Sequence, residues 1–281
     1  MILGLIGAGI RGSLAPALHT EEGRCHGLRI DYRVLELDNI EGGAQRLPEV
    51  LDTVRREGFA GVNVTYPCKQ SVMSLIDVIS PGAEAIGAVN TVVLEGGRGL
   101  VGYNTDATGW SWGLRRALPK PDLARVALMG AGGAGAACAH AVLELGAREV
   151  VIVDRVASRA QALAARLNER TTGNRAHASE LTAALRGATG FIHATPTGMA
   201  STPGIPLPES LLTPGMWVSE VVYRPLETAL VKAARARGCT VVDGGHMNVG
   251  QALGAFKLFT GLEPDAERMD AHFRRLVTAK E

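Results

Sequence analysis

The sequence has few aromatic residues and almost no net charge, and both shortages exclude classes of protein. Aromatic residues make up 4% of the 281 residues, too few for the stacking platforms that bind single-stranded nucleic acid. Lys plus Arg number 29 and Asp plus Glu number 28, which argues against nucleic acid, an anionic membrane or a polycation as the main partner. We therefore expect the ligand to be a small molecule.

Cysteine is also scarce, and no two of the four cysteines lie close together in the sequence. Cys25, Cys68, Cys138 and Cys239 form no C-x-x-C motif and have no histidine at zinc spacing, so neither a disulfide framework nor a metal site is expected. The first seven residues lack the basic segment that opens a secretory signal, and they predict a strand. These features favour a cytoplasmic protein.

Long hydrophobic runs are limited to one uncharged stretch of 18 residues, from 126 to 143. Four glycines at positions 130, 132, 133 and 135 interrupt this stretch. A buried strand, a glycine turn and an Ala-rich helix explain the same residues, so no membrane span is expected.

Glycine, by contrast, is abundant. It accounts for 35 of the 281 residues, against roughly 7% in average usage, and has no collagen period. Most of these glycines should therefore occupy particular backbone positions.

The hydrophobic pattern predicts an α/β protein with two domains, which also suits the length. In the first half, strands at 2–6, 30–37 and 61–65 alternate with helices at 15–27 and 44–57, followed by a helix from Pro67 to Ile76 and a hairpin of strands 88–94 and 100–103. A connecting helix at 107–117 leads to a second series of elements. Its strands are expected at 126–129, 150–154, 190–194, 217–222 and 240–243. Three helices between them end near 145, 169 and 237, and a last helix is expected at 249–259. We predict a mostly parallel α/β/α domain at 1–105 plus 250–281 and a Rossmann domain at 106–249.

A G-x-G-x-x-G pattern occurs twice, at 7–12 and at 130–135. The second copy follows a strand, opens an unbroken helix and lies 19 residues before Asp154, close to the spacing of the acid that binds an adenosine ribose. The first copy runs into Pro16, which delays its helix. The second copy is therefore the predicted dinucleotide site, and the first is predicted to be a turn on the substrate side.

The residues at the end of the strand expected at 150–154 give conflicting indications about the cofactor. Asp154 would accept a ribose 2′-hydroxyl of NAD and repel a 2′-phosphate, whereas Arg155 and Arg159 could accommodate that phosphate. We predict NAD as the cofactor, with NADP use open.

Polar residues gather at three strand ends of the first half. Thr65 ends a strand four residues before Lys69, and the segments Ala88-Val89-Asn90-Thr91 and Asn104-Thr105-Asp106 follow further on. These segments resemble the shikimate dehydrogenase family, whose members carry N-V-T-x-P-x-K, A-V-N-T and N-T-D in this order. The resemblance extends through 194–199, 222–225 and 243–256. The sequence near both ends of the chain is most similar to the quinate/shikimate dehydrogenase branch.

This resemblance implies an active site in the cleft between a substrate-binding domain and a Rossmann domain, and reversible NAD(P)-dependent hydride transfer at a ring hydroxyl of shikimate or quinate. It implies the catalytic pair Lys69 and Asp106. The implied substrate-binding residues are Ser13, Thr65, Asn90, Asp106, Tyr223 and Gln251. The implied cofactor-binding residues are Gly130, Ala131, Gly132, Gly133, Ala134, Asp154, Arg155, Thr195, Val221 and Gly244.

The chemistry of the residues agrees with this implication. Removing a hydride from a secondary alcohol requires a base for the hydroxyl proton, and an amine serves near neutral pH when its surroundings disfavour the ammonium. We assign Lys69 as the principal acid and base and Asp106 as the group that orients Lys69 and the substrate hydroxyl.

Four residues depart from the family pattern. Ala15 stands where a second hydroxyl is usual, His193 where Asn is common, and Gly12 and Gly250 where larger side chains are frequent. They favour a variant of shikimate or quinate as the substrate, and we predict that His193 is a hydrogen-bonded interior residue. A dehydrogenase of a related compound such as aminoshikimate and a non-catalytic nucleotide sensor remain alternatives, and a monomer and a homodimer are both open.

Overall fold

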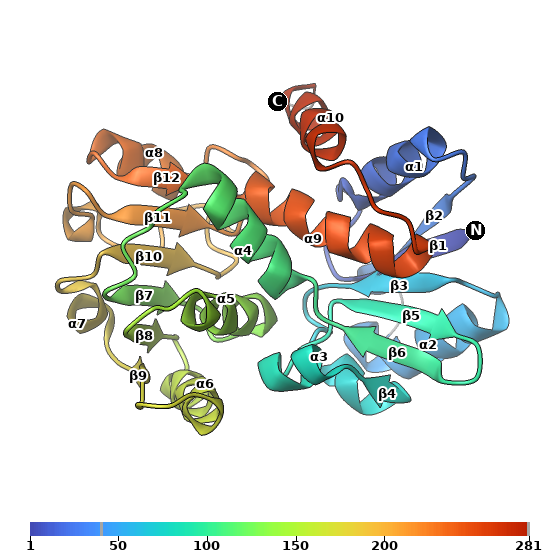
Figure 1. The fold of residues 1–281 in the computed structure, drawn as a ribbon, viewed down its shortest axis with the longest axis horizontal. Coiled ribbons are helices and arrows are strands. Elements are labelled where there is room, and N and C mark those ends of the chain that lie inside the picture. Colours follow the sequence, from blue (N-terminus) through green and yellow to red (C-terminus); the bar gives the residue numbers. More distant parts are fainter. Residues whose placement is uncertain (40–41, 280–281) are drawn as a thin grey trace. The chain divides into compact units, whose positions relative to one another are not determined.

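A computed structural model describes residues 1–39 and 42–279, and residues 40–41 and 280–281 of the expected first domain lie outside the described part. The chain divides into two compact units, unit 1 comprising Met1–Thr105 with Gln251–Glu281 and unit 2 comprising Asp106–Gly250. Figure 1 labels the elements of both units, and each unit is described separately.

Unit 1 is built on a six-stranded mixed sheet. Its strands are β1 (Ile2–Gly7), β2 (Asp31–Glu36), β3 (Gly61–Val64), β4 (Val78–Ile79), β5 (Thr91–Glu95) and β6 (Gly99–Tyr103), in the order β2-β1-β3-β5-β6-β4. β1 pairs in parallel with β2 and β3, and β4 pairs in parallel with β6. The ladders on both sides of β5 are antiparallel, so the expected hairpin is present.

Both faces of the central strands of unit 1 are buried. Successive residues of a strand point to opposite faces of the sheet. Ile6 and Val62 belong to a core on one face, together with Leu51 and Phe59. Leu3 belongs to a second core with Phe256 and Phe259. Burial on both sides explains why β1 is a continuous apolar run.

The helices of unit 1 follow from local sequence signals. They are α1 (Ala15–Cys25), α2 (Leu47–Arg56), α3 (Pro81–Ile86), α10 (Ala266–Thr278) and the C-terminal part of α9 (Gly244–Thr260), with short 3-10 helices η1 (Leu37–Asn39), η2 (Gly43–Arg46) and η3 (Ser71–Leu75). Pro16 and Pro48 lie in the first turns of α1 and α2, where a missing N–H costs little. The Ser80 side chain accepts from the Ala83 amide and caps α3.

The prediction of a helix from Pro67 to Ile76 was wrong. Residues 66–70 form turns, and only the 3-10 helix η3 follows. The turn is closed by the Cys68 amide, which donates to the Thr65 carbonyl at 2.8 Å. The short elements β4 and α3 were not predicted, and η2 replaces the first turn of the helix expected at 44–57.

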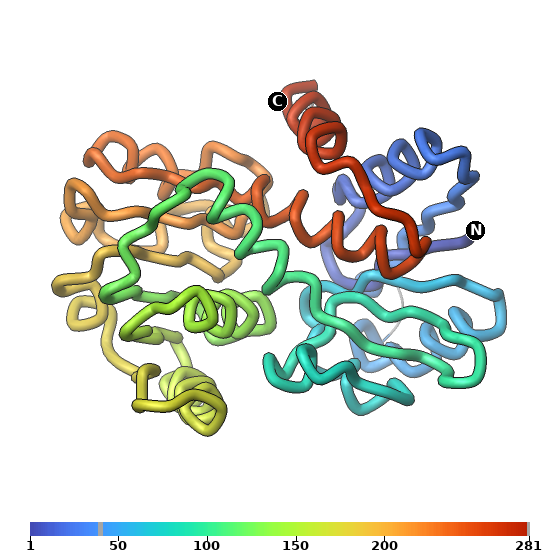
Figure 2. The backbone as a smooth tube through the Cα atoms, in the orientation of Figure 1, coloured from blue at the N-terminus to red at the C-terminus, as the bar shows by residue number. Residues whose placement is uncertain are grey.

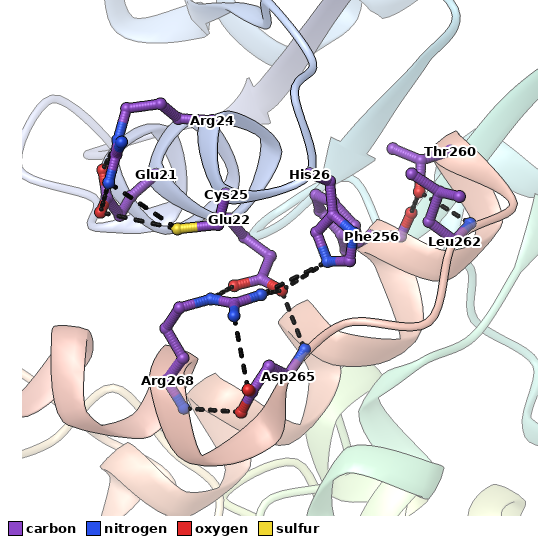
Figure 3. A network of polar contacts seen from close by, with 10 residues as sticks. All are labelled: Glu21, Glu22, Arg24, Cys25, His26, Phe256, Thr260, Leu262, Asp265 and Arg268. Carbon is purple, nitrogen blue, oxygen red and sulfur yellow. Dashed lines mark hydrogen bonds and ion pairs between the residues drawn. The ribbon is translucent and has the colours of Figure 1, made fainter.

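The helix α10, which lies beside α1 in unit 1 (Figure 2), was also not predicted. An ion pair between a buried carboxylate and a partly exposed guanidinium attaches the two helices (Figure 3). The Glu22 carboxylate is 1% exposed and accepts from the Arg268 guanidinium at 2.8 and 2.5 Å. Burial alone would raise the pKa of Glu22, but hydrogen bonds from Arg268, the Asp265 amide and His26 together hold it below its usual value. Because removing one partner would strand a buried charge, this pair should hold α10 firmly in place.

Unit 2 contains a six-stranded sheet in which every ladder is parallel. Its strands are β7 (Val126–Met129), β8 (Val150–Val153), β9 (Ala176–Ala178), β10 (Gly190–His193), β11 (Trp217–Glu220) and β12 (Thr240–Val242), in the order β12-β11-β10-β7-β8-β9. This is the strand order of a doubly wound dinucleotide-binding sheet, with its switch point between β7 and β10.

The helices of unit 2 are α4 (Asp106–Ala117), α5 (Gly133–Glu144), α6 (Ala157–Arg170), α7 (Leu181–Leu185), α8 (Ala229–Ala236) and the first part of α9, with the 3-10 helix η4 (Glu209–Leu211). The expected helices and long strands are present, whereas β9 and α7 were not predicted. The uncharged run at 126–143 forms β7, the glycine turn and most of α5, and no helix in the described part of the chain is long and apolar enough to cross a membrane.

The structure explains Gly250 by packing. A Cβ added there would lie 2.3 Å from the Gly109 carbonyl oxygen, so the start of α9 approaches α4 too closely for any side chain. A Cβ at Gly113 would similarly lie 2.8 Å from the Cβ of His246. Gly250 therefore gives no indication of a larger substrate, contrary to the expectation from the sequence.

Candidate active site

In unit 1, candidate residues collect at one edge of the sheet. β1 and β3 are parallel neighbours, so the loop after β1, which carries Ser13, meets the turn after β3, which carries Thr65. The Ala8 amide donates to the Tyr66 carbonyl at 2.9 Å, and a Cβ at Gly7 would lie 2.4 Å from Cγ2 of Thr65. Gly7 is therefore required for this close approach.

Ser13 has a local partner that leaves its hydroxyl hydrogen available. Its Oγ accepts from the Ala15 amide at 3.2 Å, just before α1 begins. The hydroxyl hydrogen can therefore be donated to a ligand carboxylate. Ala15 contributes no second hydroxyl at this position.

A buried amide network fixes the neighbouring strand ends. The Asn90 side chain is 3% exposed; its Oδ1 accepts from the Thr105 amide at 2.7 Å and its Nδ2 donates to the Thr105 hydroxyl at 2.9 Å. Asn63 donates to the Thr91 hydroxyl at 3.1 Å and accepts from the Tyr32 hydroxyl at 2.8 Å. Buried polar networks of this kind rigidify a site when their members are satisfied.

The same network holds the segments that carry Lys69 and Asp106. The Lys69 carbonyl accepts from the Val89 amide at 2.7 Å, next to Asn90. Asp106 directly follows Thr105, is 3% exposed and begins α4, where a carboxylate is favoured by the helix dipole. The Lys69 backbone is thus bonded to the residue before Asn90, and the residue before Asp106 is bonded to the Asn90 side chain.

The loop after β1 carries the first glycine pattern, and its amides are already occupied. The Gly9 amide donates to Oδ2 of Asp38 at 2.8 Å, and the Ile10 amide donates to Oε2 of the buried Glu36 at 2.8 Å. Two carboxylates at these amides would repel a phosphate. This supports the interpretation of the first pattern as a turn.

The second glycine pattern leaves its centre open. Gly130 has a φ of +109°, and a Cβ on Gly135 would lie 1.8 Å from the Gly130 carbonyl oxygen, so both positions require glycine. In the described part of the chain, a Cβ on Gly132 would meet no atom within 4 Å, and no side chain caps this start of α5. A pyrophosphate could therefore approach the uncapped amides at Gly133 and Ala134, and this loop fits a dinucleotide.

Asp154 lies beside this loop at the end of β8. Its Oδ2 accepts from the Ala131 amide at 2.8 Å and its Oδ1 accepts from the Val156 amide at 2.9 Å. Arg155 follows with an exposed side chain. Both residues therefore lie where a ribose next to the pyrophosphate would be expected.

Three other candidate cofactor residues follow the neighbouring strands of unit 2. Thr195 comes after β10, Val221 after β11 and Gly244 after β12, at the carboxyl edge of the parallel sheet. A Cβ on Gly244 would lie 2.2 Å from the Val222 carbonyl oxygen, so these loops are closely packed.

A buried hydrogen-bond partner of His193 at this edge was not predicted. Glu220 is 1% exposed, and its Oε1 lies 2.8 Å from Nδ1 of His193, which is 0% exposed. The prediction that His193 is a hydrogen-bonded interior residue is confirmed. The only indication of Glu220 in the sequence was a charged residue at the end of an apolar strand.

The two remaining candidates lie in different units. Tyr223 follows β11 in unit 2, and Gln251 lies on α9 where the C-terminal segment of unit 1 begins. Both are partly buried.

The fold defines a class of protein: an α/β protein in which a dinucleotide-binding sheet is joined to a second unit bearing an amine, hydroxyls and an amide network. Models of two families match the chain. The shikimate dehydrogenase substrate binding domain matches residues 5–92, and the shikimate / quinate 5-dehydrogenase model matches residues 114–200.

Known relatives agree over nearly the whole chain. A shikimate dehydrogenase (NADP(+)) of Streptomyces avermitilis is 53% identical over 98% of this chain and 96% of that protein. A quinate/shikimate dehydrogenase (NAD(+)) of Corynebacterium efficiens is 44% identical over 98% of each. The solved structure of quinate dehydrogenase from Corynebacterium glutamicum in complex with NAD superposes with a TM-score of 0.90 at 41% identity, covering 98% of this chain and 99% of that one. The chain belongs to the shikimate dehydrogenase family.

Proposed function

We propose that the protein catalyses reversible NAD(P)-dependent oxidation of a ring hydroxyl of shikimate or quinate, with reduction of the 3-dehydro compounds as the reverse reaction. The observation that supports this most directly is the Asn90 network, which anchors the segments of Lys69 and Asp106 in a chain that also carries an open dinucleotide loop. Membership of the family favours the same activity.

Lys69 acts as the principal acid and base. Its Nζ takes the hydroxyl proton during oxidation and returns it during reduction. Asp106 orients the amine and the reacting hydroxyl through its carboxylate, and the buried start of α4 limits its movement. Lys69 is partly buried, and a site that limits water at the amine would support this role.

Substrate is held by hydroxyl and amide groups. Ser13 donates to the ring carboxylate, while Thr65, Asn90, Tyr223 and Gln251 bind the ring hydroxyls. Ala15 offers no second donor, and a missing hydrogen bond to a carboxylate costs about 1.5 to 3 kcal/mol. We therefore expect weaker binding of ordinary shikimate or quinate, or a differently substituted relative as the true substrate.

The glycine loop at 130–135, Asp154, Arg155, Thr195, Val221 and Gly244 would hold the dinucleotide. When bound, its nicotinamide ring accepts or gives the hydride. We propose NAD as the preferred cofactor because the Asp154 carboxylate lies beside the Ala131 amide, where it would repel a 2′-phosphate. Relatives named for either cofactor leave NADP as the competing possibility.

A spectrophotometric screen at about 340 nm tests the proposal, with NAD and NADP each offered with shikimate, quinate, aminoshikimate and other cyclic hydroxy acids. We expect turnover of shikimate or quinate, faster with NAD. Turnover of aminoshikimate alone would identify the related dehydrogenase instead. Dinucleotide binding without turnover of any compound would favour the nucleotide sensor and overturn the proposal. We expect this enzyme in the cytoplasm, as a monomer or homodimer.

A further inference from the structure

The buried pair of His193 and Glu220 lies at the carboxyl edge of the sheet in unit 2, among three candidate cofactor residues. The two side chains lie at the ends of the neighbouring strands β10 and β11, and both are essentially inaccessible to solvent. Their proposed role rests on the proposed use of a dinucleotide. Burying two titratable groups is costly, so their hydrogen bonds should have a definite arrangement.

The surroundings of Glu220 make it an acceptor. Its Oε1 receives the amides of Val221 and Val222 at 2.8 and 3.0 Å, and its Oε2 receives the Thr228 hydroxyl at 3.0 Å. The Thr228 oxygen itself accepts from the Val231 amide, which leaves its hydrogen for Glu220. With donors on both oxygens, Glu220 is a carboxylate, and Nδ1 of His193 must carry the hydrogen on their contact.

We take His193 as the neutral ring, and for that ring the arrangement sets the direction of the next hydrogen bond. A neutral His193 with its hydrogen on Nδ1 presents a lone pair at Nε2, which lies 2.5 Å from the Thr195 hydroxyl oxygen. The hydrogen on that contact then comes from Thr195. The same oxygen also accepts from the Thr197 amide at 3.3 Å. The Thr195 oxygen can therefore accept one more hydrogen bond from a ligand. Its own hydrogen is already donated to His193, so it cannot donate to the ligand.

We propose that His193 and Glu220 are positioning residues that make Thr195 a hydrogen-bond acceptor for an N–H or O–H donor on the nicotinamide half of the dinucleotide. The strand order supports this location. The glycine loop and Asp154 follow β7 and β8 on one side of the switch point, so the other half of a dinucleotide extends over the ends of β10 and β11. A phosphate oxygen, which has no hydrogen to donate, does not suit Thr195 in this state.

Nitrogen-15 NMR of the histidine rings tests the first step without any activity measurement. We expect His193 to be neutral, with a protonated Nδ1 and an unprotonated Nε2. Thr195→Val should change the Nε2 signal and leave the Nδ1 signal in place. A protonated Nε2 in the wild-type protein would overturn the inference, because Thr195 would then be free to donate.

Calorimetric binding of dinucleotides to the full chain tests the second step. Thr195→Val should weaken NAD binding about three- to tenfold, the effect of one neutral hydrogen bond, and Thr195→Ser should restore wild-type affinity. Ser219→Ala is the matched control, since Ser219 is 1% exposed, precedes Glu220 on β11 and bonds Trp110 at 2.9 Å away from the candidate residues. It should lower stability and leave the affinity unchanged.

A second dinucleotide identifies the donor. In 3-acetylpyridine adenine dinucleotide the carboxamide NH2 is replaced by a methyl group, so Thr195→Val should not weaken its binding if that NH2 is the donor. Equal weakening of both dinucleotides would support a ribose hydroxyl as the donor. Unchanged NAD affinity in Thr195→Val, with the wild type binding normally, would overturn this inference alone. Failure of the wild type to bind either NAD or NADP would overturn the proposed function.

Discussion

The two glycine loops share one pattern, G-x-G-x-x-G, and differ in what their amides contact. In the loop after β1, the amides of Gly9 and Ile10 donate to Asp38 and Glu36. In the loop after β7, Asp154 takes only the Ala131 amide, and the space beside Gly132 is open. The pattern therefore specifies a tight turn, whereas the neighbouring acids decide what the turn can bind.

The helices that follow the loops differ in the same way. The helix α5 begins at Gly133, inside the pattern, so its uncapped amides belong to the loop. The helix α1 begins at Ala15, after the pattern has ended, with a proline in its first turn. Only the second loop combines an open glycine with a helix N-terminus, as dinucleotide binding requires.

The largest expected effect separates the proton transfer assigned to Lys69 of unit 1 from the dinucleotide binding assigned to unit 2. Lys69→Ala should lower kcat about a hundred- to ten-thousandfold, because the hydroxyl proton loses its acceptor, with dinucleotide affinity unchanged. Steady-state kinetics and calorimetry measure the two quantities. Lys232→Ala, an exposed lysine on α8, is the control and should match the wild type. A kcat within a factor of a few of wild type in Lys69→Ala would refute the assignment.

The long elements of both units could be predicted because their apolar periodicity extends over at least four residues. β4 has only 2 residues, and β9 (Ala-His-Ala) lacks the two adjacent valines that allowed the equally short β12 to be predicted. The helix α10 did carry a signal, since Met269, Phe273 and Val277 recur every fourth residue behind the capping residue Asp265. Its docking through Glu22, 246 positions away in sequence, could not be foreseen.

The candidate site shows the same division. Lys69 and Asn90 belong to contiguous motifs and could be singled out, whereas Glu36 and Glu220 contact residues 26 and 27 positions away. A carboxylate that serves distant amides or a distant ring has no local signature. Such groups become visible only once the strands are paired.

The next largest effect concerns stability in acid. Burial lowers the pKa of His19 on α1 from 6.5 to about 4, an effect that the nearby Glu22 opposes, and neither ring nitrogen has a hydrogen-bond partner among the described residues. The unfolded chain therefore binds a proton first as the pH falls, so the neutral ring contributes stability above pH 6.5 that is lost between 6.5 and 4. The loss should be roughly 3 kcal/mol.

Urea unfolding of the wild type and His19→Leu across this pH range measures that loss. The leucine suits the ring stack that His19 forms with Tyr32 and Phe256, and it should flatten the pH dependence of the unfolding free energy. His140→Leu on α5, the helix after the second loop, is the control because that side chain is partly exposed. Equal slopes for the wild type and His19→Leu would show that another group causes the acid sensitivity.

A smaller effect compares the loops directly through their second glycines. Gly132 has an ordinary φ of −80°, so Gly132→Ala should fold with unchanged stability, yet its methyl group would occupy the space for the pyrophosphate. We expect NAD binding to weaken more than about tenfold. Gly9 has a φ of +67°, so Gly9→Ala should lose about 1 kcal/mol of stability without affecting NAD binding. Calorimetry measures the NAD affinity of both variants, and thermal unfolding measures their stability. Unchanged NAD affinity in Gly132→Ala would place the dinucleotide elsewhere.

The smallest effect comes from a comparison of the two aspartates that accept loop amides, the partly buried Asp154 and the exposed Asp38. Asp154→Asn keeps an oxygen for the Ala131 amide but removes the charge that would face a 2′-phosphate, so the ratio of NADP to NAD affinity should rise about tenfold. Asp38→Asn makes the same change beside Gly9 and should leave the ratio unaltered. Competition binding of both cofactors to both variants provides the measurement. Equal ratios in Asp154→Asn and the wild type would mean that the carboxylate only holds the loop, and cofactor choice would then depend on its cationic neighbour Arg155.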